Sequence, residues 1–397
     1  MCKMFPRWVG MVVSGLLPCL KLAVNVGAQD WEVISDVPAD HVVVSADGSK
    51  MAAVSYLGRG VYASGDGGRT WGLTDAPTDE HLNALASSAD GARLFVVGEG
   101  PGQAGGAIYL STNSGAIWTA TSAPTNVWES VACSADGTYV AAAGVGFYLS
   151  ADGGATWKGV GLPGATGWWR SIAMSADGVT LAVVSGNGTG YTSTNCGVTW
   201  TAINVPLGFW PAVASSADGS QLVLASYSAP IYVSTNFGAA WWPTTVYLGE
   251  GGAQSSVASS ADGTTLVVAG NPQVLLSTNG GCSWSTNLTL YITNYVGVAS
   301  SADGHKLVAS LVSRTYILQT LPSPVLSLTA SQTDVSLSWL VPSMKFVLQE
   351  KAATDTAQWT EVPVPPTLVC TNLHYRVTVP KSPQARFYRL ALVQTTP

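Results

Sequence analysis

The sequence has few charged residues, and those it has are not gathered by sign. Charged residues make up 10% of the 397 residues, and the formal net charge is −6. A surface that binds nucleic acid needs clustered Lys and Arg side chains to neutralise phosphates. The sequence contains no such cluster and no acidic tail. We therefore expect no nucleic-acid partner.

The sequence also lacks the patterns of several other protein classes. No CxxC pair and no Cys/His cluster occurs, so neither a metal site nor a cofactor is expected. Apolar stripes with a period of 3.6 residues, which helical repeats require, are absent. The mostly apolar run over residues 8–20 has 13 residues, too few to span a bilayer.

The N-terminal segment resembles a signal peptide. Lys3 and Arg7 precede the apolar run, and small residues at 26–28 precede a candidate cleavage site before Gln29. We expect residues 1–28 to direct export, which gives a secreted protein, extracellular or periplasmic, without a membrane span.

What the sequence has in abundance are turn formers and apolar residues. It contains 43 glycines and 15 tryptophans, and 47% of its residues are hydrophobic. This composition is typical of a turn-rich all-β protein with a substantial core.

Two short motifs repeat along residues 29–321. Ser-Ala-Asp-Gly occurs seven times, with its Asp at 47, 90, 136, 177, 218, 262 and 303. A Ser-x-Asp/Asn-x-Gly-x-x-Trp motif, called the box motif below, follows the first six copies and ends at Trp71, Trp118, Trp157, Trp200, Trp241 and Trp284. One repeat divides into four short strands, at 128–133, 139–143, 147–150 and from 157 on. Four strands in roughly 43 residues match one blade of a β-propeller.

The seventh repeat lacks a box motif and a closing Trp. The missing strand matches the start of the chain, where Asp30-Trp31 has the layout of Thr70-Trp71. We therefore predict a seven-bladed β-propeller over residues 29–321 whose last blade is completed by the N-terminal strand. Such closure removes the two open sheet edges of a linear array.

The box motif resembles the Asp-box (BNR) repeat. The resemblance covers six copies and implies the propeller fold shared by sialidases and by the photosystem II assembly-factor family, which acts by binding proteins. The Phe/Tyr-Arg-Ile-Pro motif of sialidases does not occur in this sequence. Asn stands at the acidic position in four boxes, at Asn113, Asn195, Asn236 and Asn279. A catalytic acid or metal ligand would not be exchanged so freely, so the motif is expected to form a turn.

Residues 322–397 have a different pattern. Alternating apolar runs, such as 335–339 and 375–379, are separated by Pro and polar turns. They predict a small β-sandwich, similar to fibronectin type III or immunoglobulin modules.

Candidate ligand-binding residues lie at the start of each innermost strand, eight residues before the repeat Asp. Trp128, Trp169, Trp210 and Tyr295 occupy this column, where aromatic faces around a channel mouth could stack on a sugar or peptide. The alternative is that the indoles pack neighbouring blades against each other. Nearby ionisable candidates are Glu80, Glu99, Glu129 and Arg170.

Together these patterns indicate an exported, non-catalytic binding or scaffold protein that presents an aromatic-rimmed face to a glycan or protein ligand. The alternative is a glycoside hydrolase, sialidase-like or glucan-active, in which two of the three carboxylates act as an acid pair. A structural surface protein without a discrete ligand is the third interpretation.

Overall fold

The chain folds almost entirely into β-strands. The computed structural model describes residues 31–37, 39–55, 60–78, 81–162, 168–205, 212–226, 229–248, 255–270, 273–289, 296–311, 314–320, 324–352, 359–383 and 385–393. Within these ranges the helical structure is one short 3₁₀ helix, Pro101–Gln103. The predicted all-β class is confirmed, and the segment 1–28 lies outside the described residues.

Seven four-stranded antiparallel sheets make up the described part of the chain before residue 320. Six of them use four consecutive strands each. The first three are β2 (His41–Val44), β3 (Met51–Ser55), β4 (Gly60–Ser64), β5 (Gly72–Leu73); β6 (His81–Ser87), β7 (Leu94–Glu99), β8 (Ile108–Ser111), β9 (Thr119–Ala120); and β10 (Trp128–Cys133), β11 (Val140–Gly144), β12 (Gly146–Ser150), β13 (Lys158–Gly159). The next three are β14 (Trp169–Met174), β15 (Leu181–Ser185), β16 (Gly190–Ser193), β17 (Thr201–Ala202); β18 (Ala212–Ser215), β19 (Leu222–Ala225), β20 (Pro230–Ser234), β21 (Trp242–Tyr247); and β22 (Ser256–Ser259), β23 (Leu266–Gly270), β24 (Gln273–Ser277), β25 (Ser285–Thr289).

The remaining sheet joins both ends of the repeat region. Its strands are β26 (Val296–Ser300), β27 (Lys306–Leu311), β28 (Arg314–Gln319) and β1 (Glu32–Ser35). Strand β1 pairs with β28, with Glu32 opposite Ile317. The N-terminal strand thus completes the last repeat, as its sequence layout predicts.

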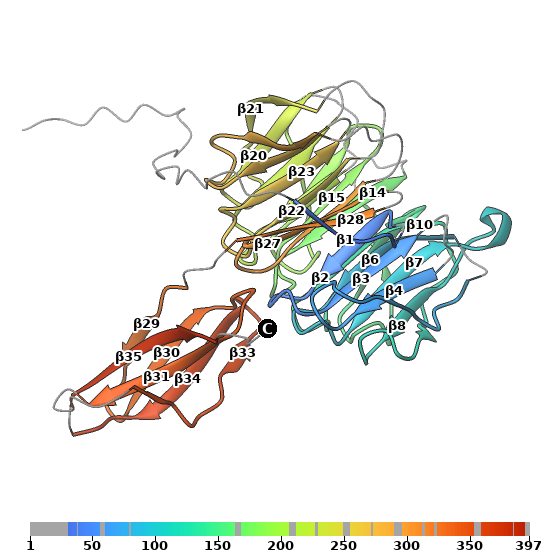
Figure 1. The fold of residues 1–397 in the computed structure, drawn as a ribbon. Coiled ribbons are helices and arrows are strands. Elements are labelled where there is room, and N and C mark those ends of the chain that lie inside the picture. Colours follow the sequence, from blue (N-terminus) through green and yellow to red (C-terminus); the bar gives the residue numbers. More distant parts are fainter. Residues whose placement is uncertain are drawn as a thin grey trace, which may run out of the picture.

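The sheets are arranged around a common axis (Figure 1). The first strand of each repeat contacts the first strand of the next, from β2 through β6, β10, β14, β18, β22 and β26, and β26 contacts β2 again. Apolar side chains fill the space between neighbouring sheets. One such cluster contains Phe95 from β7, Trp128 from β10 and Val140 from β11, all fully buried. Burial of these side chains between sheets is the main stabilising contribution.

The box motif forms a turn held by side-chain hydrogen bonds. In the first copy, the Ser64 hydroxyl donates to Asp66 Oδ1 (2.8 Å) and accepts from the Gly68 N–H (2.9 Å), while Asp66 Oδ1 accepts from the Thr70 N–H (2.9 Å). The Trp71 indole N–H donates to the Gly68 carbonyl (2.9 Å). An amide oxygen makes the same contacts, as Asn113 Oδ1 does with the Ile117 N–H (2.9 Å). This explains why Asp and Asn exchange at this position.

The Ser-Ala-Asp-Gly motif closes the hairpin between the first and second strands of each repeat. Asp136 Oδ1 accepts from the Ser134 hydroxyl (2.6 Å) and from the Thr138 N–H (2.9 Å). Gly137 takes a left-handed φ of 68°, a conformation that glycine adopts without a side-chain clash. The seven copies therefore lie at one end of the axis.

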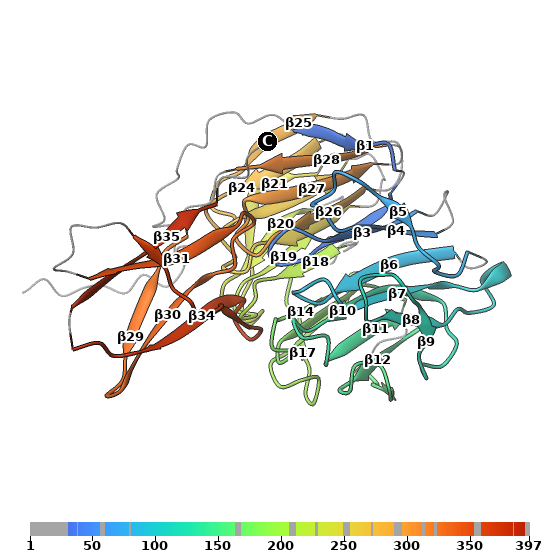
Figure 2. The same cartoon turned by 60° about the horizontal axis from the view of Figure 1, so that its bottom comes forward.

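The C-terminal residues form two further sheets with a shared core. One sheet has the order β29 (Ser327–Ala330), β30 (Asp334–Leu340), β34 (His374–Pro380), β33 (Thr367–Val369), and the other β32 (Thr360–Glu361), β31 (Phe346–Ala352), β35 (Arg386–Leu392). Trp339 from β30, Leu348 from β31 and Val377 from β34 meet in the core. Figures 1 and 2 show these sheets, called the C-terminal module below, as a separate body against one side of the repeat region.

Candidate functional site: a row of bulged residues

Three neighbouring innermost strands carry a β-bulge near their first residue. In β10, Trp128 pairs with Gly144 and Ser130 pairs with Ala143, which leaves Glu129 as the extra residue. The same register shift leaves Asn83 extra in β6 and Arg170 extra in β14. A bulge turns its extra side chain away from the regular alternation and often lies beside functional sites. We call Asn83, Glu129 and Arg170 the bulge row.

Two hydrogen bonds connect the bulge row across the three neighbouring sheets. The Asn83 side-chain amide donates to the Trp128 carbonyl at 2.8 Å. Arg170 Nη1 donates to Glu129 Oε2 at 3.0 Å. All three residues stand seven positions before a repeat Asp, so they lie at the end of the axis opposite the Ser-Ala-Asp-Gly turns.

Glu129 is the electrostatic centre of the row. Its side chain is 17% exposed and that of Arg170 is 34% exposed. Burial raises the pKa of the Glu129 carboxyl, and the charge of Glu99 adds to this effect, while Arg170 and a hydrogen bond from Trp168 oppose it. The net direction is upward. The structure therefore brings together Glu99 and Glu129, two of the predicted carboxylates, with Arg170 bound to one of them.

An exposed indole completes the site. Trp168 is 46% exposed, and the Arg170 guanidinium carbon lies 5.8 Å from the centre of its ring. A guanidinium over an indole face is a cation–π contact. Carboxylates beside a partly open aromatic face suit a basic side chain, because both attract a cation and the ring also offers apolar area.

The structure corrects the prediction that Trp128 and Trp169 present their rings to a ligand. Their side chains are 0% and 3% exposed. Trp128 packs edge-on against Tyr148, with ring centres 5.4 Å apart, and its N–H donates to the Gly106 carbonyl at 3.1 Å. Trp169 packs in the same way against Tyr191. Both rings fill the space between adjacent sheets, which is the alternative that the sequence left open.

The other predicted site residues, Trp210, Tyr295 and Glu80, lie outside the described residues. Sequence reasoning missed Asn83 and Trp168. Asn83 could have been found, because it stands in the same repeat column as Glu129 and Arg170. Trp168 precedes Trp169 directly, but nothing in the sequence says which of the two indoles faces outward.

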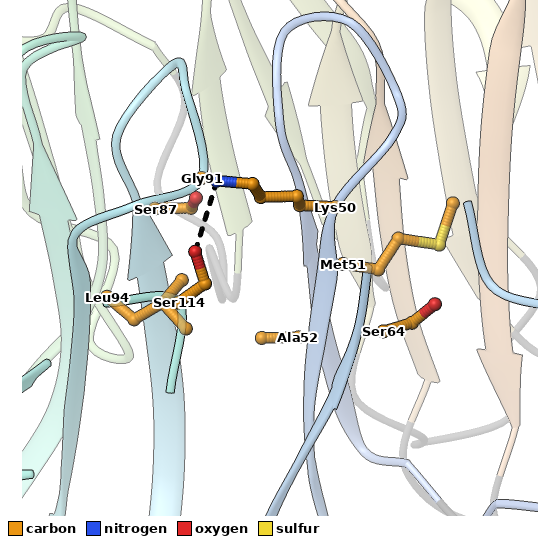
Figure 3. A pocket seen from close by; sticks show the side chains of 8 residues that line it. All are labelled: Lys50, Met51, Ala52, Ser64, Ser87, Gly91, Leu94 and Ser114. Atoms are coloured by element: carbon orange, nitrogen blue, oxygen red, sulfur yellow. Dashed lines mark hydrogen bonds between the residues drawn. The ribbon is translucent and has the colours of Figure 1, made fainter. Parts of the chain in front are cut away.

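A small recess lies away from the bulge row, between the first two sheets (Figure 3). Its lining includes Lys50, Met51, Leu94 and Ser114. The Lys50 ammonium donates to the Ser114 hydroxyl at 3.1 Å across it. The recess is thus bridged by the protein's own side chains.

The described part of the chain contains neither a candidate metal site nor a candidate membrane-spanning helix. No group of three or more His, Cys, Asp or Glu residues there is placed to hold a metal ion. No helix within the same residues is long and apolar enough to cross a membrane.

Comparison with known proteins identifies the fold. No protein family model matches the chain, and no curated protein matches its sequence. Among solved structures, YCF48 bound to D1 peptide matches with a TM-score of 0.53 and 16% identity, covering 78% of this chain and 99% of that one. YCF48 from Cyanidioschyzon merolae matches with a TM-score of 0.55 and 13% identity, covering 73% and 99%. U3-55K matches with a TM-score of 0.59 and 13% identity, covering 74% and 100%. These neighbours are β-propellers, and at such low identity they establish the architecture alone. The chain therefore has a β-propeller fold.

Proposed function

We propose that this protein is an exported, non-catalytic scaffold that binds a protein partner at the bulge row. In this proposal residues 29–321 form a seven-bladed propeller of the Asp-box type, similar to the photosystem II assembly-factor family. Residues 322–397 form a β-sandwich of the fibronectin type III or immunoglobulin kind. The seven four-stranded sheets support the first part, and the two C-terminal sheets with one core support the second.

The observation that carries the proposal is the chemistry of the bulge row. The Asn83 amide N–H is used by the Trp128 carbonyl, so its side-chain oxygen is the group left for a peptide N–H. Glu99 adds negative charge beside Glu129, which Arg170 already pairs, and Trp168 offers a ring that is 46% exposed with Arg170 beside it. An extended peptide segment with a Lys or Arg side chain satisfies all three. A solved neighbour of the same fold, YCF48, has been captured with a peptide, which supports a peptide ligand over a glycan.

The burial of Trp128 and Trp169 weakens the case for a glycan. Sugar rings stack on open aromatic faces, and these two indoles have none. The hydrolase alternative keeps one supporting observation, the raised pKa of Glu129 beside Glu99. Arg170 acts against it, because the ion pair with Glu129 favours the charged form of that carboxyl and opposes the rise of its pKa, whereas a general acid must carry a proton.

The test is a peptide array on the full chain, with peptides of about 12 residues that vary one Lys or Arg position. For the best binder, Trp168→Ala is expected to weaken affinity about 30-fold, the size of an interface hot spot. Glu129→Gln should lower the preference for a basic residue. Ile117→Ala, which alters an exposed side chain in a box motif, is the matched control and should leave affinity unchanged.

Two results would contradict the proposal. The first is an array on which no peptide binds above background. The second is Trp168→Ala binding as tightly as the wild type. A parallel hydrolysis assay on sialosides and glucans separates the alternative, because turnover that is lost in Glu129→Gln would make the protein an enzyme.

Export is tested separately. The chain produced from its full gene in a secreting host should appear outside the cytoplasm and begin at Gln29 when its N-terminus is sequenced. A cytoplasmic product that retains residues 1–28 would refute this part of the proposal.

A further inference from the structure

The seven alanines of the Ser-Ala-Asp-Gly turns are joined in a closed ring. Each donates its backbone N–H to the carbonyl of the next at 2.7–2.9 Å, and the last donates to the first. We call them the alanine ring; they are Ala46, Ala89, Ala135, Ala176, Ala217, Ala261 and Ala302. These hydrogen bonds connect every pair of neighbouring repeats at this end of the axis.

The alanine ring is an apolar surface, and the C-terminal module covers it. All seven methyl groups belong to two apolar clusters that also contain module residues. Leu373 is the central contact, because it belongs to both clusters. Val341 is 1% exposed and packs with Ala46 and Ala302, while Cys370 packs with the alanines of the other cluster.

Polar contacts attach the module where the ring of sheets closes. The Ser343 N–H donates to Asp303 Oδ2 at 2.6 Å, and the Gln319 side-chain amide donates to the Ser343 hydroxyl at 3.2 Å. Asp303 follows β26 in the sheet that β1 completes. Between the last and the first sheet, the Lys306 ammonium donates to the Gly48 carbonyl at 3.0 Å. The module therefore sits over the seam between the first and last repeats.

The backbone of Leu373 supports a specific fit. Its φ is 53°, in the left-handed region that bulky side chains rarely adopt. Such a conformation persists only where surrounding contacts hold it in place. Leu373 ends the turn between β33 and β34, so the turn carries its apolar side chain onto the ring.

We infer that the C-terminal module docks onto the propeller of its own chain. The alanine ring is its docking site, and Leu373 is the residue that fixes its position there. Docking covers one end of the propeller axis. It also bridges the junction between the last sheet, which contains β1 and β28, and the first sheet, which begins with β2. The bulge row lies at the opposite end of the axis, away from this contact. The inference stands without any ligand, so it can fail while the proposed function holds, and the reverse.

Hydrogen exchange of the full chain, read by mass spectrometry, tests the inference. The variant Leu373→Asp keeps a residue type that tolerates the left-handed backbone but removes the apolar contact. We expect the ring amides to exchange about ten- to one-hundredfold faster, since the apolar side chain of a half-buried leucine is lost from the contact. Amides of β1 and β28 should also exchange faster, while β30 and β34 inside the module stay protected. Small-angle X-ray scattering should show a larger radius of gyration.

Leu328→Asp is the matched control, because Leu328 is in the same module and is 56% exposed. It should behave as the wild type. If Leu373→Asp does not fold, Leu373→Ala replaces it, with a smaller increase in exchange at the same amides. Ring protection and scattering that stay at control values in the folded variant would overturn the inference. A wild-type dimer in sedimentation, with the module of one copy on the ring of another, would overturn docking within one chain.

Discussion

His41 makes the stability of this protein depend on pH in a defined direction. The side chain lies in β2, the innermost strand of its sheet, and its Nδ1 is buried with no hydrogen-bonding partner among the described residues. Burial disfavours the charged imidazolium and lowers the pKa of His41 from 6.5 to about 4. The folded protein therefore holds this ring neutral at pH values where the unfolded chain binds a proton.

The sign and the size follow from proton linkage. Well above pH 6.5 both states are neutral at this ring, so its contribution to stability is complete. As the pH falls from 6.5 toward 4 the unfolded state gains a proton first, and stability is lost. With pKa values of 6.5 and about 4, the loss is about 2 kcal/mol at pH 5 and about 3 kcal/mol below pH 4.

Urea unfolding at pH 7 and pH 5 measures this loss when His41→Gln is compared with the wild type. Glutamine is neutral at both pH values, so the wild type should lose about 2 kcal/mol more than the variant between them. Carboxylates that titrate in this range act equally in both proteins and cancel in the comparison. If the two proteins lose the same free energy to within about 0.5 kcal/mol, the ring is not held neutral and the reasoning is refuted.

Substitutions at three further positions test the fold. Gly144→Ala should lower the free energy of unfolding by about 3 kcal/mol in urea, because a Cβ there would meet the Val127 carbonyl oxygen at 1.9 Å. A loss below about 1 kcal/mol would contradict this contact. Trp128→Ala should cost about 3–5 kcal/mol by the same assay, because it empties space between two sheets; a near-neutral effect would mean that the ring is not buried. Asn113→Asp should keep the stability of the protein, because a carboxylate oxygen can accept the same hydrogen bonds from Ser111 and Ile117. Asn113→Ala should lose about 1 kcal/mol of unfolding free energy, because these bonds are lost. Equal losses in the two variants would contradict this role of the side-chain oxygen.

Much of the propeller could be predicted because its information is local and repeated. Strands expected at 128–133, 139–143 and 147–150 correspond to β10, β11 and β12, with shifts of one residue at some ends. Alternating apolar residues specify a strand, and Asp-Gly turns separate strands, wherever they occur. Strand β33 of the C-terminal module has only three residues, which carry too little alternation to be recognised in a sequence.

The candidate site could be predicted only in part. The repeat column places Glu129 and Arg170 near one end of the axis, and the structure pairs them at 3.0 Å. The bulges that turn them out of the regular alternation depend on the register between two strands, and composition does not show register. The outward position of Trp168 and the inward position of Trp169 depend on the neighbouring sheet that each ring meets.

The sequence by itself determined the β-class, the repeat period and the pairing of the N-terminal strand with the last repeat, because these depend on short patterns and on matching the two ends of the repeat region. Only the tertiary structure decided which indoles are buried, which polar residues form the bulge row and where the C-terminal module docks. Those outcomes depend on surfaces that meet only after the sheets have packed. The packing of Leu373 against both alanine clusters is an example, since no local pattern encodes it.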